Sequence, residues 1–105
     1  MKNFEDRLES STNILNKHQN RKPIIIYYPD KDINFKFLLL DSHTISIVLL
    51  NLKQRLKLNN EDSIYLFINK TTIPCPTDSI LNLYNKFKDD DGYLYMDVRK
   101  ENTFG

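Results

Sequence analysis

The stretch PIIIYYPDKDINFKFLLL, residues 23–40, decides the fold. Its first half, Ile24 to Tyr28, is β-branched and aromatic, which is typical of a strand. Pro29 to Asp32 is a cluster of residues that favour a tight turn. Phe35 to Leu40 is too short and too aromatic to favour a helix and follows that turn closely. The stretch therefore predicts a β-hairpin.

A helix is predicted after the hairpin, because apolar residues recur at helical spacing over residues 45–56 and basic residues fill the last turn. Thr44 or Ser42 is the expected cap. Ile64 to Ile68 is a nearly continuous apolar run, as expected for a strand that a helix covers.

A second short helix is predicted over residues 80–87, with Thr77 or Asp78 as its cap, before a final strand from Tyr93 to Val98. Upstream of the hairpin, residues 4–17 carry apolar side chains at near-helical intervals, and three possible capping residues follow one another in the middle, Ser10, Ser11 and Thr12. They predict two short helices with a break.

A hairpin, a crossing helix and two later strands are most economically arranged as an α+β, ubiquitin-like β-grasp fold with a four-stranded mixed sheet. The two short N-terminal helices extend it. A chain of 105 residues suits one domain, 1–105. We expect a helical extension over 1–20, a β-grasp core over 21–98 and a flexible conjugation tail over 99–105.

Composition argues against several classes of function. The formal net charge of +1 gives no reason to expect a nucleic-acid partner. The longest apolar run is too short to span a bilayer and the first residues are charged, so the chain reads as cytoplasmic. Cys75 is the only cysteine and is expected to be a small buried thiol rather than a nucleophile. Asp89 to Asp91 lack the spacing of a calcium loop and are interpreted as the end of a helix. No catalytic residue, metal site or cofactor is predicted.

The sequence ends in glycine, and a terminal glycine has chemical uses. With no Cβ beside the carboxylate, the tail can thread a narrow enzyme channel and present an unhindered acyl group for transfer to an amine. Gly105 is therefore a candidate for conjugation, as in ubiquitin-like modifiers.

Short segments along the whole chain form an ordered set: Phe4-Glu5-Asp6-Arg7, Arg21-Lys22-Pro23-Ile24-Ile25, Lys36-Phe37-Leu38-Leu39, Leu56-Lys57-Leu58, Glu61-Asp62-Ser63-Ile64, Leu66-Phe67-Ile68-Asn69 and Asp91-Gly92-Tyr93-Leu94-Tyr95. In order and spacing they resemble the autophagy-related ubiquitin-like modifiers, the family that includes the GABA-receptor-associated proteins. The chain is identified as a divergent member.

The resemblance implies that the Gly105 carboxylate is adenylated, passed through cysteine thioesters of activating and conjugating enzymes, and joined to phosphatidylethanolamine. The product would be a membrane-tethered adaptor in autophagosome formation and cargo or receptor recruitment, on the autophagosome or another organelle membrane. Phe104 would be read by the cysteine protease that removes the lipid.

The resemblance also implies that receptors with an aromatic-x-x-aliphatic motif bind as an added strand on the hairpin edge. The aromatic pocket would comprise Ile14, Pro23, Ile25, Lys36, Leu38 and Tyr93. The aliphatic pocket would comprise Phe37, Leu39, Leu40, Val48, Asn51 and Arg55. Arg21 and Lys36 would form salt bridges with acidic neighbours of the motif.

Several positions depart from the family pattern, among them Ser10 in place of an acid and Leu40 in place of proline. Two alternatives stay open. One is a modifier joined to a protein lysine, as in the sister autophagy family. The other is a peptide-binding β-grasp domain that is never conjugated and would tolerate Gly105→Ala.

Overall fold

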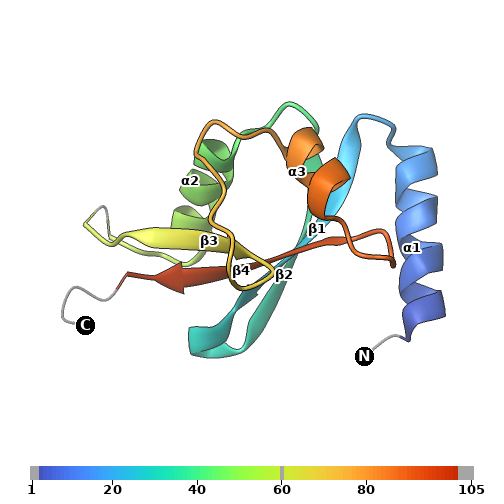
Figure 1. The fold of residues 1–105 in the computed structure, drawn as a ribbon. Coiled ribbons are helices and arrows are strands. Elements are labelled where there is room, and N and C mark those ends of the chain that lie inside the picture. The colour runs from blue at the N-terminus through green and yellow to red at the C-terminus, as the bar shows by residue number, and fades with distance from the viewer. Residues whose placement is uncertain (1–2, 60, 102–105) are drawn as a thin grey trace.

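The computed structural model describes residues 3–59 and 61–101. Within these residues the chain forms three α-helices, four strands and one short 3-10 helix (Figure 1). In chain order they are α1 (Phe4–Lys17), β1 (Arg21–Tyr28), η1 (Pro29–Lys31), β2 (Ile33–Leu40), α2 (Ile45–Arg55), β3 (Ile64–Ile68), α3 (Ile80–Phe87) and β4 (Leu94–Lys100).

The four strands form one mixed sheet in the order β2-β1-β4-β3. β1 is antiparallel to β2 and parallel to β4, and β3 is antiparallel to β4. The predicted hairpin is confirmed, but both of its strands begin earlier than expected, at Arg21 and Ile33. Its turn is the 3-10 helix followed by Asp32 in the left-handed conformation, with φ of 52°. The ubiquitin-like β-grasp architecture predicted from the sequence is therefore correct.

The two short N-terminal helices predicted from the sequence are wrong, because α1 is one continuous helix of 14 residues. Its N-cap is Asn3, whose side chain accepts a hydrogen bond from the Asp6 backbone N–H. The supposed breakers do not break it. The Ser11 side chain is buried in a tertiary contact, and Thr12 Oγ1 donates to Leu8 O inside the helix.

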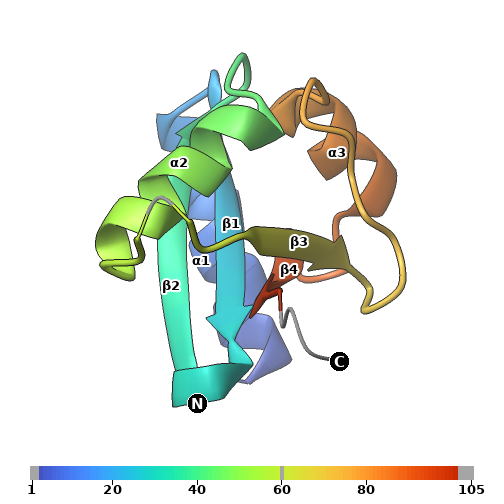
Figure 2. The same cartoon turned by 90° about the vertical axis from the view of Figure 1, so that its left-hand side faces the viewer.

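The core lies between one face of the sheet and helices α2 and α3. Ile24, Ile26 and Met96 on the sheet pack with Val48 and Leu52 of α2, and all five are almost inaccessible to solvent. Helix α1 lies on the opposite face of the sheet, against its β1 side (Figure 2). This second face carries the alternate residues of each strand and is covered at one end only.

Three smaller expectations are corrected. Helix α3 is capped by Ser79, whose Oγ accepts from Asn82 N–H, and not by Thr77 or Asp78. Cys75 is exposed rather than buried. Strand β4 continues to Lys100 because β3 pairs with it, so the first two residues of the expected tail, Arg99 and Lys100, belong to the sheet. Helices long and apolar enough to cross a membrane do not occur in residues 3–59 and 61–101.

Candidate functional site

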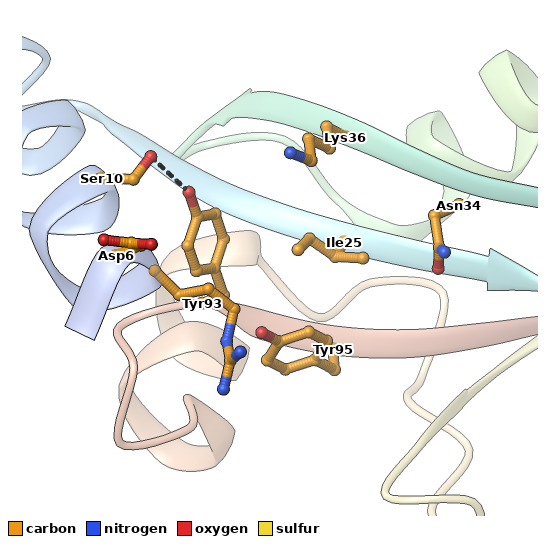
Figure 3. A pocket seen from close by; sticks show the side chains of 8 residues that line it. Asp6, Ser10, Ile25, Asn34, Lys36, Tyr93 and Tyr95 are labelled. Atoms are coloured by element: carbon orange, nitrogen blue, oxygen red, sulfur yellow. Dashed lines mark hydrogen bonds between the residues drawn. The ribbon is translucent and has the colours of Figure 1, made fainter. Parts of the chain in front are cut away.

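A pocket with a volume of about 720 Å³ opens beside α1, on the face of the sheet opposite α2 and α3 (Figure 3). This size falls in the range of ligand sites in proteins. One wall comes from α1 and the other from three strands and the residue before β4. The lining residues are Asp6, Arg7, Ser10, Ile25, Asn34, Lys36, Tyr93 and Tyr95.

The local periodicities bring these side chains together. Asp6 and Ser10 are four residues apart in α1 and so share one face of the helix. Ile25 is paired directly with Lys36 across the hairpin, so both side chains project from the same face of the sheet. Tyr93 and Tyr95 are two residues apart, and their ring centroids lie 6.3 Å from each other.

Asp91 joins the two walls of the pocket. Only 2% of its surface is exposed, yet it is a carboxylate, so it requires partners. Its Oδ2 accepts from Arg7 Nε of α1 at 2.9 Å and from the Tyr95 hydroxyl, while Oδ1 accepts from the Tyr93 backbone N–H at 2.9 Å. Its backbone oxygen accepts from Ser11 Oγ at 2.6 Å. One aspartate therefore attaches α1 to the start of β4.

Two groups that line the pocket and contact Asp91 have a raised pKa. The hydrogen bond to Asp91 raises the pKa of the Arg7 guanidinium, which stays charged. Burial, then the hydrogen bond to Asp91, raises the pKa of the Tyr95 hydroxyl above its usual value. The tyrosine is accordingly a neutral donor to a carboxylate over the whole physiological range.

Gly92 lets α1 approach this closely. Its φ of +85° disfavours any residue with a side chain, and a Cβ added there would lie 2.2 Å from Ser11 Oγ. The Tyr84 hydroxyl of α3 donates to Gly92 O at 2.6 Å and fixes the loop from the other face of the sheet. Glycine is thus required by both the backbone angle and the close contact.

Strand β2 forms an open edge beside the pocket, since it pairs only with β1. Asp41 N–H donates to Asn20 O at 2.9 Å, and the antiparallel alternation from there makes Lys22–Leu39 and Ile24–Phe37 the hydrogen-bonded pairs. The backbone groups of residues between them, Lys36 and Leu38, therefore point outward. An extended peptide could pair with this edge.

The opposite side of β2 presents a second surface towards α2. The Arg55 guanidinium of α2 stacks over the rings of Phe35 and Phe37, at 5.4 Å and 5.2 Å from their centroids. Of the predicted aliphatic pocket, Phe37, Leu40 and Asn51 are half-buried and Arg55 is exposed. Leu39 and Val48 are different, because they belong to the buried core with 6% and 1% of their surface exposed.

The structure brings together only part of the predicted aromatic pocket. Ile25, Lys36 and Tyr93 line the cavity, whereas Ile14, Pro23 and Leu38 are not among its lining residues. Pro23 pairs with Leu38 on the same face of the sheet, and Pro23 is buried. Arg21, expected to meet an acidic ligand, donates from Nη1 to Leu38 O at 3.2 Å.

Sequence reasoning missed five lining residues, namely Asp6, Arg7, Ser10, Asn34 and Tyr95. Strand alternation from Lys36 and Tyr93 would have found Asn34 and Tyr95. The three α1 residues needed one continuous helix, which the sequence did not suggest. Gly105 and Phe104, the predicted conjugation and protease-recognition residues, lie outside the described residues.

Comparisons with known proteins give one consistent result. A family model described as "Autophagy protein Atg8 ubiquitin like" matches residues 6–105. "Autophagy-related protein 8h" of Arabidopsis thaliana is 34% identical over 107 residues, which cover 96% of this chain and 88% of the relative. "Autophagy-related protein 8" of Kluyveromyces lactis is 36% identical over 109 residues, covering 97% of this chain and 86% of the relative.

Solved structures agree with the sequence matches. The crystal structure of Trypanosoma brucei ATG8 superposes with a TM-score of 0.85 at 28% identity, covering 99% of this chain and 93% of that one. The likeness extends over the helix α1 as well as the β-grasp core, because nearly the whole chain is covered.

Proposed function

The chain belongs to the Atg8 family of ubiquitin-like autophagy proteins, and we propose that it is a modifier whose Gly105 carboxylate is conjugated to phosphatidylethanolamine. One observation carries the proposal: the family match runs to Gly105 itself. The carboxylate would be adenylated, passed to cysteine thiols of activating and conjugating enzymes, and amidated by the lipid amine, with a cysteine protease that reads Phe104 reversing the bond.

Such a bond changes where the protein resides. A diacyl lipid contributes about 0.8 kcal/mol for each buried CH₂, and two chains anchor a protein stably. Conjugation would therefore be a membrane switch, placing the chain on an autophagosomal or other organelle membrane as an adaptor in autophagosome formation.

We further propose that the tethered protein recruits receptors through peptides with an aromatic-x-x-aliphatic motif. The open edge of β2 supports this reading, because a bound strand would pass between the α1 pocket on one face and the Arg55 surface on the other. Lys36 and Arg21 lie beside that path and would attract acidic neighbours of the motif.

The two activities would use opposite ends of β4. The strand starts beside the pocket, where Tyr95 lines the wall, and ends at Lys100, roughly 20 Å away at 3.3 Å for each residue. A membrane held at Gly105 would leave the α1 end accessible to a receptor.

Fractionation of cells tests the conjugation. Wild-type protein should divide between membranes and the soluble fraction, and a lipase that cleaves the phospholipid should release it. Gly105→Ala should be found in the soluble fraction alone, whereas the control Glu101→Ala, an exposed residue beyond β4, should behave as wild type. Equal membrane recovery of Gly105→Ala would overturn the proposal.

A further inference from the structure

Two hydroxyl groups from opposite walls of the α1 pocket meet. Ser10 Oγ of α1 and the Tyr93 hydroxyl lie 2.9 Å apart and form a hydrogen bond (Figure 3). Both residues line the cavity, and 83 positions separate them in the sequence. Their mutual bond uses one of the two hydroxyl protons, so the pair still has a donor and lone pairs to offer to a ligand.

A ligand that fills the pocket would separate the two hydroxyls from bulk water, so they would lose the hydrogen bonds that they make to water. Tyr93 is only 7% exposed, and its ring packs beside Tyr95 with an interplanar angle of 52°. An apolar side chain entering the pocket would cover the pair without replacing its hydration, which is unfavourable. A side chain with its own N–H or O–H would replace the lost water.

We infer that the Ser10–Tyr93 pair makes this pocket selective for an anchor side chain that carries a hydrogen-bonding group, tryptophan or tyrosine rather than phenylalanine. The inference rests on the proposed peptide capture and goes beyond it by naming the residues that decide the choice of anchor. Asp6, on the α1 wall with Ser10, favours the same choice, because its carboxylate can accept from an indole N–H or a phenol.

The expected discrimination is about five- to tenfold in Kd, the usual effect of one neutral hydrogen bond. It is smaller than in sites that leave a buried group wholly unpaired, because Ser10 and Tyr93 already partner each other.

Three fluorescently labelled acidic peptides that differ only in the anchor, tryptophan, tyrosine or phenylalanine, provide the test. Their Kd values are measured by anisotropy against the whole chain, its double variant Ser10→Ala/Tyr93→Phe, and the control Thr12→Ala. Thr12 is exposed on α1, and its hydroxyl donates to Leu8 O within the helix, so the control removes a hydroxyl outside the pocket.

Wild type and Thr12→Ala should bind the tryptophan and tyrosine peptides about five- to tenfold more tightly than the phenylalanine peptide. In the double variant Ser10→Ala/Tyr93→Phe, which removes both hydroxyls, that ratio should fall below about twofold. A variant that only loosens α1 would raise the Kd of all three peptides by the same factor and leave the ratio unchanged.

An unchanged ratio in the double variant, or a wild-type ratio below twofold, would overturn the inference while leaving peptide capture intact. If the wild-type chain bound none of the three peptides, the proposed capture itself would fail, and the inference with it.

Discussion

Asp91 is the residue on which the attachment of α1 depends most. It receives hydrogen bonds from Arg7, Ser11, Tyr93 and Tyr95, so it links the helix to the strand that follows. The sequence shows three adjacent aspartates, which are interpreted as the end of a helix. Only the fold reveals that Asp91 is buried while its neighbours Asp89 and Asp90 are exposed.

We predict that Asp91→Ala lowers the free energy of unfolding by about 3 kcal/mol, because it removes the buried carboxylate to which Arg7 and Tyr95 donate. Urea denaturation followed by circular dichroism measures the change. Asp90→Ala is the matched control and should stay within about 0.5 kcal/mol of wild type. Equal stability of the two variants would show that the hydrogen bonds of Asp91 contribute nothing to the free energy of unfolding.

The raised pKa of Tyr95 makes stability depend on pH in the alkaline range. Burial and Asp91 keep this hydroxyl protonated in the folded chain at pH values where it ionises in the unfolded chain, above about 10. The stability linked to this group is therefore complete below pH 10 and is lost as the pH rises further.

We therefore predict that the free energy of unfolding falls less steeply above pH 10 in Tyr95→Phe than in wild type, although the variant is less stable at neutral pH. Denaturation measured from pH 8 to pH 11.5 gives the two slopes. Tyr65→Phe, which removes the hydroxyl of a tyrosine on β3 that is 40% exposed, serves as the control. If the free energy of unfolding fell with pH equally steeply in wild type and Tyr95→Phe, the raised pKa of Tyr95 would be contradicted.

The hairpin and α1 show what local sequence can and cannot predict. Residues 23–40 combine β-branched runs with a turn cluster, so their pairing followed from local chemistry. Helix α1 was misread because Ser10, Ser11 and Thr12 normally compete with helical hydrogen bonds. Here Ser10 and Ser11 form hydrogen bonds with residues some 80 positions away. Such tertiary contacts cannot be predicted from a local sequence pattern.

Strand β2 is the element on which the proposed peptide capture depends. Lys36→Glu combined with Leu38→Ala should raise the Kd of an acidic aromatic-x-x-aliphatic peptide by at least about fiftyfold, since a favourable charge becomes repulsive and apolar contact is lost. Isothermal titration calorimetry gives the affinities. Lys86→Glu on α3 makes the same charge change on the other side of the sheet and should bind as wild type. Unchanged affinity in the double variant would place the peptide elsewhere.

Across the whole molecule, the pocket and the C-terminal strand end are separated along β4. The α1 helix covers one end of the sheet and shapes a cavity whose walls carry polar groups, while β4 leads away from it towards the proposed conjugation residue. The ubiquitin-like core lies between the two regions, an arrangement that would suit the proposed function of binding a receptor while joined to a lipid.

The mass of the C-terminal peptide, released by proteolysis from protein recovered from cells, tests the central claim most directly. We predict a peptide ending at Gly105 with the added mass of a phosphatidylethanolamine amide, present in wild type and lost in Gly105→Ala. An isopeptide to a protein lysine would indicate the sister type of modifier. A bare carboxylate under every condition would contradict conjugation altogether.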